Sequence, residues 1–388
     1  MQMITVFTPI YNRAYIIDQL YQSLLRQTSS AFEWLIVDDG STDNITELVE
    51  QWMKSTQKFK IRFYRQENGG KHRAINYGIR LAKYEAFFIV DSDDYLEDDA
   101  IETILKYWND INTDGKFAGI SGLKRHEDGE IIGEKPTFSD FADATNLERG
   151  QFGLGGDKAE VYKTELMRHF PFPEYENESF ITEAVVWNRI AYEGYKLRWI
   201  NKSFMICDYR PDGLTAKGQR LFPDNPKGWA CYIRMQKEYE AIEESSYLKR
   251  CYYYYECECK RLTDREIKTM LGLNHSEFHI ITGQYAKFSQ KLTELCFGRK
   301  VCVYPYGQWG KRLKRYLDRL GIQIDYVIDK HFEKIGEIKA YAIEMDLPQV
   351  DVIFVALSKD AEEAAKTVRN KMPMAEIILC KDIKPEIW

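Results

Sequence analysis

The sequence predicts an α/β protein built around a doubly wound sheet. Three segments in the first 90 residues share one order: an apolar strand, a polar loop, and a stretch with apolar residues at helical spacing. A fourth apolar run, Phe87–Val90, ends on three carboxylates within four residues. Strands and helices alternating at this spacing are typical of a parallel sheet covered on both faces, with the loops after the strands at one edge.

Each repeat can be assigned a strand and a helix. In the first, we expect Pro9 to end the strand because proline has no N–H group to donate to a neighbouring strand. The second strand runs into the acidic loop Asp38–Asp43, and the third into Glu67–Lys71. The expected strands lie at residues 3–7, 32–37 and 59–65. The helices that follow them are expected at residues 16–25, 44–52 and 72–83.

The carboxylates after Phe87–Val90 have two possible roles. Four apolar residues in a row suit a central strand, whose carboxyl end is where open α/β sheets bind ligands. Asp91 and Asp93 could direct oxygens at one Mg²⁺ or Mn²⁺ ion that also holds a substrate's phosphates. Alternatively, the acids form a turn that caps a helix starting near Glu97, and Asp94 could be no more than that cap.

Composition narrows the class of protein. A chain of 388 residues with a 44% hydrophobic share predicts two or three folded domains. The formal charge of −6 gives no basic footprint for nucleic acid. No run of about 18 apolar residues occurs, and the first strand begins at Met3, so we expect a cytoplasmic protein. The eight scattered cysteines are expected to be free thiols.

Four motifs in order resemble glycosyltransferase family 2 with the GT-A fold. They are Thr8–Arg13, Val37–Asp43, Asn68–Lys71 with Ala74 and Asn76, and Asp91–Asp94, and the resemblance covers roughly the first 215 residues. It implies a nucleotide-diphospho-sugar transferase domain with a doubly wound mixed sheet, in which the last motif is the family's DXD motif. It also implies a nucleotide-sugar donor, in our interpretation a UDP-sugar, a Mn²⁺ or Mg²⁺ cofactor, and inversion at the anomeric carbon.

The resemblance also assigns roles to residues. Asp39, with Asp38 beside it, stands where the family has the aspartate that accepts the imide N–H of uracil. The same loop could instead be only a turn and a helix cap. We expect Asp39 to contact the nucleotide and Asp43 to cap the following helix. Lys71 would face the diphosphate, and Asp93 would hold the cation with help from Asp91. The implied donor-binding residues are Thr8, Pro9, Tyr11, Asp38, Asp39, Lys71, Asp91 and Ser92, and the implied metal ligands are Asp91 and Asp93.

The general base is expected beyond the acidic loops. The family opens a helix with an acidic pair followed six residues later by arginine, and here that spacing selects Glu183 and Arg189. Thr182 stands where the family has its first acid, Glu183 replaces an aspartate, and Glu178 lies close by as a competitor. We expect Glu183 to take the proton of the acceptor hydroxyl.

Two further segments could line the site. Gly155–Lys158 could contact the diphosphate or acceptor, or form a tight connection into a strand at 159–162. Tyr209–Thr215 could close over the donor, or be an ordinary exit loop.

The rest of the chain is expected to form two more parts. We predict a glycosyltransferase domain over 1–224, a helical linker region over 225–298, and a small Rossmann-like accessory domain over 299–388. In the last part, Asp329 follows Gly307 by a spacing that suits a ribose-binding acid, but Pro305 stands where the nucleotide-binding fingerprint has its first glycine. We therefore expect an accessory or assembly module.

The leading hypothesis is a metal-dependent inverting glycosyltransferase of polysaccharide biosynthesis. Its acceptor would be a hydroxyl of a saccharide or lipid-linked glycoconjugate, with peripheral contact at the inner face of the membrane and homo-oligomerisation left open. The alternatives are a nucleotidyltransferase and a non-catalytic scaffold that binds nucleotide-sugars or carbohydrate.

Overall fold

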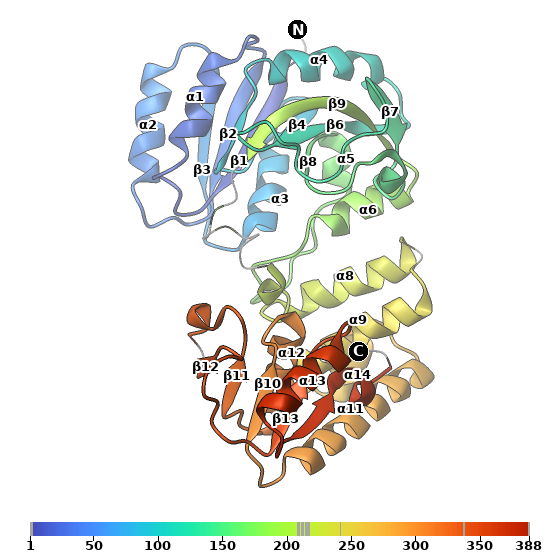
Figure 1. Cartoon of the computed structure of the whole chain (residues 1–388). Coiled ribbons are helices and arrows are strands. Elements are labelled where there is room, and N and C mark those ends of the chain that lie inside the picture. Colours follow the sequence, from blue (N-terminus) through green and yellow to red (C-terminus); the bar gives the residue numbers. More distant parts are fainter. Residues whose placement is uncertain are drawn as a thin grey trace. The chain divides into compact units, whose positions relative to one another are not determined.

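A computed structural model divides the chain into two compact units, Met1–Ile242 and Glu243–Trp388. The structure describes residues 3–207, 210, 213, 218–240, 242–336 and 338–386. Each unit has its own sheet (Figure 1). The predicted α/β class with a GT-A-type mixed sheet is confirmed, and a second, parallel sheet follows in the C-terminal unit.

The first sheet runs in the order β3-β2-β1-β4-β8-β6-β9-β5, and β7 pairs with β9. Its four N-terminal strands are parallel, whereas β8 is antiparallel to both β4 and β6. The strands are β1 (Ile4–Ile10), β2 (Phe32–Asp38), β3 (Lys60–Arg65), β4 (Ala86–Ile89), β5 (Asp94–Leu96), β6 (Phe117–Arg125), β7 (Phe141–Ala144), β8 (Lys158–Lys163) and β9 (Lys196–Cys207).

Helices cover both faces of this sheet. Apolar residues of α1, α2 and α4 share one core with side chains such as Val6 and Phe88, while α3, α5 and α6 share another with Phe7 and Phe87. Neighbouring strand residues point to opposite faces, which is why a continuous apolar run suits these central strands. The helices are α1 (Asp18–Arg26), α2 (Ile45–Ser55), α3 (Lys71–Leu81), α4 (Ala100–Ile111), α5 (Thr164–His169), α6 (Ala184–Tyr192) and α8 (Pro226–Glu238).

Strand β1 continues past Pro9, contrary to the prediction that proline ends it. The Phe7 carbonyl accepts from Val90, and the Ile10 carbonyl accepts from Asp39, so alternate residues face β4 and β2. Pro9 therefore faces the β4 side, at a level beyond the last strand residue of β4, Ile89. Proline is tolerated there because no strand residue of β4 pairs with it.

The expected helix near Glu97 starts three residues later. Helix α4 begins at Ala100, and the residues after the acidic motif form β5, which pairs with β9. Asp94 is the first residue of β5 and lies opposite Cys207, so it is not a helix cap.

The second unit contains a parallel sheet in the order β12-β11-β10-β13-β14. Its strands are β10 (Val301–Tyr304), β11 (Tyr326–Ile328), β12 (Ala340–Tyr341), β13 (Val352–Val355) and β14 (Glu376–Leu379). Its helices are α9 (Glu244–Glu258), α10 (Asp264–Leu271), α11 (His275–Cys296), α12 (Gln308–Leu320), α13 (Ala361–Lys371) and α14 (Cys380–Ile383). This arrangement agrees with an α/β accessory part, whose Rossmann-like character stays a prediction.

The predicted linker region 225–298 is divided between the two units. Helix α8 packs on α6 in the first unit. Helices α9 and α11 pack around α12 in the second, where buried Glu256 contacts Arg312 at 2.8 Å and Arg319 at 3.2 Å. The two compact units meet at residue 242, and the predicted limits at 224 and 298 stay predictions.

Two expectations from composition can be compared with the structure. All eight cysteines are free thiols, as predicted. Across the described ranges, no helix is long and apolar enough to cross a membrane.

Candidate active site

The candidate site lies at the switch point of the first sheet. The chain winds outward from β1 to β3 and then returns to place β4 on the other side of β1. The loops that follow β1 and β4 therefore separate above the sheet, and open α/β sheets bind ligands in the crevice this creates. Tyr11 lies on the first of these loops, and Asp91 and Asp93 lie on the second.

Lys71 brings three of the predicted elements together. It is the first residue of α3, and its ammonium nitrogen lies 2.7 Å from Oδ1 of Asp91 and 2.7 Å from Oε1 of Glu183. Asp91 follows β4, and Glu183 occupies the N-cap position of α6. Burial would lower the pKa of Lys71, but these two carboxylates outweigh it and raise the pKa, so the lysine is charged.

The two carboxylates of the DXD motif differ in their surroundings. Burial opposes the ionised form of Asp91, but the ammonium groups of Lys71 and Lys124 outweigh it and lower its pKa. Burial and the negative charge of Asp91 raise the pKa of Asp93. A divalent cation between Asp91 and Asp93 would relieve that repulsion, and carboxylate oxygens are the ligands that Mg²⁺ and Mn²⁺ prefer. These residues therefore fit the implied metal.

Asp39 holds the glycine turn in front of Lys71. Its Oδ1 accepts hydrogen bonds from Gln66 Nε2 at 2.7 Å and from the Gly69 N–H at 2.9 Å, and its Oδ2 accepts the Gly70 N–H at 2.7 Å. Since a carboxylate oxygen has two lone pairs, Oδ1 is fully used and Oδ2 retains one acceptor position. The role predicted for Asp39 on the nucleotide base is thus confined to Oδ2.

The other residues of the predicted donor pocket occupy distinct environments. Thr8 is buried, and its hydroxyl accepts the indole N–H of Trp34 at 3.0 Å. Pro9 and Ser92 are also buried, whereas Tyr11 is 48% exposed at the edge of the crevice. Their parts in donor binding stay predictions.

Asp38 and Asp43 fasten the acidic loop instead of facing solvent. Buried Asp38 accepts the Ser41 N–H at 2.8 Å, and Arg65 lies 3.5 Å from its second oxygen. Asp43 accepts the N–H groups of Ala14 at 2.9 Å and Ile45 at 3.3 Å, so it joins the loop after β1 to the start of α2. The N-cap position of α2 itself belongs to the next residue, Asn44.

The structure separates the two candidate bases. Both oxygens of Glu178 accept backbone N–H groups at the start of α8, from Lys227 and Gly228 at 2.8 Å each, and the residue is 8% exposed. The side chain of Glu183 is 41% exposed and faces Lys71. Glu178 is therefore committed to a helix N-terminus, where a carboxylate is stabilised, and Glu183 remains accessible to an acceptor.

Other predicted segments lie away from this chemistry. Arg189 is exposed, and its guanidinium lies 5.2 Å from the centre of the Phe170 ring. In the Gly155–Lys158 segment, Lys158 is buried and donates to the Gly155 carbonyl at 2.7 Å. This contact favours the interpretation of that segment as a connection into β8.

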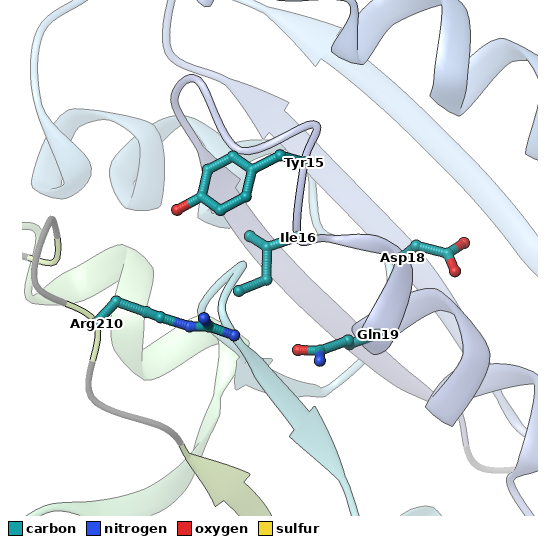
Figure 2. A pocket seen from close by; sticks show the side chains of 5 residues that line it. All are labelled: Tyr15, Ile16, Asp18, Gln19 and Arg210. Atoms are coloured by element: carbon teal, nitrogen blue, oxygen red, sulfur yellow. The ribbon is translucent and has the colours of Figure 1, made fainter.

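A pocket of about 320 Å³ lies beside the loop after β1. It is lined by Tyr15, Ile16, Asp18, Gln19 and Arg210. Figure 2 shows the Arg210 side chain extending from its own segment toward Ile16 and Gln19. The Arg210 carbonyl accepts the Gly213 N–H at 3.1 Å, and a methyl group added at Gly213 would lie 4.0 Å from a carboxylate oxygen of Asp93.

The segment expected to close over the donor, Tyr209–Thr215, falls largely outside the described residues. Of that segment, the structure describes Arg210 and Gly213 alone.

Two charged residues near the acids were not singled out by sequence reasoning. Lys124 of β6 lies 3.5 Å from Asp94 and lowers the pKa of Asp91. Burial raises the pKa of Glu160, on β8, to about 7, with Arg149 and Lys124 opposing the shift. Glu160 lies opposite Ser121 of β6. The available signal was the position of each charged residue beside buried apolar neighbours, Leu123 for Lys124 and Val161 for Glu160.

The sequence was compared with models of known protein families. Residues 5–136 match the sequence model described as Glycosyl transferase family 2. The N-terminal part of the chain is thus similar to this family.

Curated relatives include two proteins of Streptococcus pneumoniae serotype 4. Glycosyltransferase GlyG is 37% identical over 130 residues, which cover 30% of this chain and 42% of GlyG. Glycosyltransferase GlyA is 24% identical over 360 residues, which cover 83% of this chain and 51% of GlyA. The chain therefore spans about half or less of these relatives' lengths. Chondroitin synthase of Pasteurella multocida is 36% identical over 142 residues, covering 36% of this chain and 14% of the synthase.

The fold is shared with a solved structure. S. aureus TarS residues 1–349, determined in complex with UDP-GlcNAc, aligns with a TM-score of 0.50 at 18% identity and covers 74% of this chain and 81% of that one. At this identity the comparison shows a shared fold.

Proposed function

We propose that the chain transfers a sugar from a UDP-sugar to a hydroxyl group of a saccharide or glycoconjugate acceptor, with inversion at the anomeric carbon. The observation that carries the proposal is the cluster in which Lys71 touches both Asp91 and Glu183. It joins a candidate diphosphate site to a candidate base, and glycosyl transfer needs both within reach of one sugar.

On the donor side, the nucleoside would lie over the end of β1. Tyr11 would offer an exposed ring and Asp39 the remaining acceptor position of Oδ2. TarS, which shares this fold, was solved with UDP-GlcNAc, and this supports a uridine donor.

The diphosphate would lie at the ends of β4 and α3. Asp93 and Asp91 would hold Mn²⁺ or Mg²⁺, which when bound would neutralise charge on the leaving diphosphate. Arg13 also contributes here, since its positive charge opposes the rise in the pKa of Asp93.

On the acceptor side, Glu183 would accept the proton of the attacking hydroxyl. Attack from the side opposite the leaving diphosphate would invert the anomeric carbon. Relatives named for chondroitin and hyaluronan synthesis support a saccharide acceptor. A lipid-linked acceptor, a cytoplasmic location with membrane contact, and a homo-oligomer stay predictions.

The test compares two glutamates of the same segment. We would measure UDP release from a panel of UDP-sugars with Mn²⁺, with saccharide acceptors and with water alone, and follow the product anomer by NMR. Glu183→Gln is expected to lower turnover about 10²- to 10⁴-fold, the usual contribution of a general base. Glu178→Gln should retain turnover, because that carboxylate binds the start of α8.

Other outcomes would support a different class. Equal turnover in the wild type and Glu183→Gln would contradict the proposed base. Pyrophosphate release from nucleoside triphosphates and sugar phosphates would instead indicate a nucleotidyltransferase. Stabilisation by UDP-sugars without any UDP release would indicate a binding scaffold.

A further inference from the structure

Lys71 connects three elements that are far apart in the sequence. Its ammonium group contacts Asp91 at the end of β4 and Glu183 at the start of α6, while its backbone begins α3. The side chain is only 24% exposed. One ammonium group has three N–H donors, so it can bond both carboxylates at once, but its single positive charge is shared between them.

The backbone around Lys71 is held on both sides. Asp39 fixes the Gly70 N–H, and a methyl group added to Gly70 would overlap the Ser179 carbonyl. Arg73, two residues after Lys71, donates to the carbonyls of Tyr175 and Glu178. The start of α3 and the segment that leads to Glu183 are therefore packed as one body, and the Lys71 bridge has little freedom to shift.

We propose that Lys71 is a positioning residue that couples cation binding at Asp91 and Asp93 to the placement of Glu183, an inference that rests on the proposed function. A divalent cation neutralises part of the charge of Asp91, so that carboxylate competes less for the ammonium group. The Lys71 charge then acts mainly on Glu183 and holds it in place. Because coupling is reciprocal, Glu183 in turn affects how tightly the cation binds.

This reciprocity can be measured without turnover. Mn²⁺ binding is followed by the EPR signal of the free ion, with no donor or acceptor present, in the wild type, Lys71→Met, Glu183→Gln and the double variant. Lys71→Met should tighten Mn²⁺ binding about threefold or more, because an opposing cation is removed. Glu183→Gln should weaken it about threefold or more, because the whole Lys71 charge then turns to Asp91.

The decisive measurement is the effect of Glu183→Gln when Lys71 is absent. In the Lys71→Met background, that effect should fall to within about 1.5-fold, and in Lys71→Arg, which keeps the charge, it should be retained. Lys83→Met is the matched control. Lys83 is exposed two residues beyond the end of α3, a helix that rises about 15 Å from Lys71 to Leu81, and its removal should leave Mn²⁺ binding unchanged. Melting temperatures confirm that each variant is folded.

Each contrary result has a separate meaning. If Glu183→Gln weakens Mn²⁺ binding equally with and without Lys71, the glutamate acts through space and the coupling is refuted. The same holds if Lys71→Met leaves Mn²⁺ affinity unchanged. Absence of Mn²⁺ binding in the wild type overturns both the coupling and the metal part of the proposed function, whereas intact coupling without sugar transfer overturns the proposed function alone.

Discussion

The carboxylate of Asp39 accepts the backbone N–H of Gly70 at 2.7 Å, across 31 positions of sequence. A second bond from the same carboxylate reaches Gly69 at 2.9 Å. The loop after β2 thereby holds the turn that presents Lys71. This acid is 4% exposed, and its first function in the structure is to fix the backbone of another loop.

Replacing Asp39 should therefore lower stability as well as any nucleotide affinity. Asp39→Ala leaves two backbone donors and one amide without their acceptor, and each unsatisfied buried group costs about 1–3 kcal/mol. We expect a lower urea midpoint by tryptophan fluorescence even without ligand. Asp98→Ala is the control, since Asp98 is 62% exposed and pairs with Arg26 at the surface. Equal midpoints for the two variants would show that Asp39 is not a structural acid.

Gly70 tests the packing on the other side of the turn. Its φ of 96° and the approach of Ser179 both disfavour a side chain. Gly129 has a similar φ of 91°, but nothing lies within 4 Å of a methyl group added there. Gly129→Ala should cost about 1–2 kcal/mol from backbone conformation alone. Gly70→Ala should cost about 1–3 kcal/mol more from overpacking, measured by urea unfolding. A Gly129→Ala variant as unstable as Gly70→Ala would argue against the steric account.

These contacts explain which parts of the site could be predicted from sequence. The strands and the acids at their ends follow from local patterns, so the apolar run before Asp91 was sufficient to place it at the sheet edge. The partners of Asp39 could not be predicted, because Gly69 and Gly70 approach it only after β2 and β3 pair. Likewise, the spacing to Arg189 favoured Glu183 but left Glu178 as a competitor, and the contacts of Glu178 with the start of α8 were needed to separate the two.

Because His72 is buried, we expect the protein to lose stability on mild acidification. Burial, together with the positive charge of Arg73, lowers its pKa to about 4, while Glu174 acts in the opposite direction. The folded state thus binds a proton less readily than the unfolded state, whose ordinary value is 6.5. This contribution to stability is fully present above pH 6.5 and is lost as the pH falls from 6.5 toward 4.

The measurement is the urea midpoint at pH 7 and at pH 4.5. A pKa shift of this size corresponds to about 3 kcal/mol at most between those limits. His72→Gln cannot be protonated and should show a weaker fall in midpoint than the wild type. As a control, His275→Gln on α11, which leaves His72 in place, should retain the wild-type fall. If His72→Gln falls as steeply as the wild type, other groups carry the acid sensitivity.

Glu256 provides a test of the unit boundary at residue 242. Its side chain on α9 is 1% exposed and contacts Arg312 and Arg319 of α12. These contacts join α9 to a helix of the second unit. Breaking a buried ion pair from one side leaves uncompensated charge and costs about 3–5 kcal/mol. Glu256→Gln should therefore increase hydrogen exchange in peptides of both α9 and α12 and leave α8 unchanged. Glu362→Gln, which removes a 75% exposed partner of Lys381, is the matched surface control and should change exchange little. Faster exchange confined to α9 would mean that this helix behaves as a linker, as the sequence first suggested, whereas coupled changes in α9 and α12 would place both in one cooperative unit.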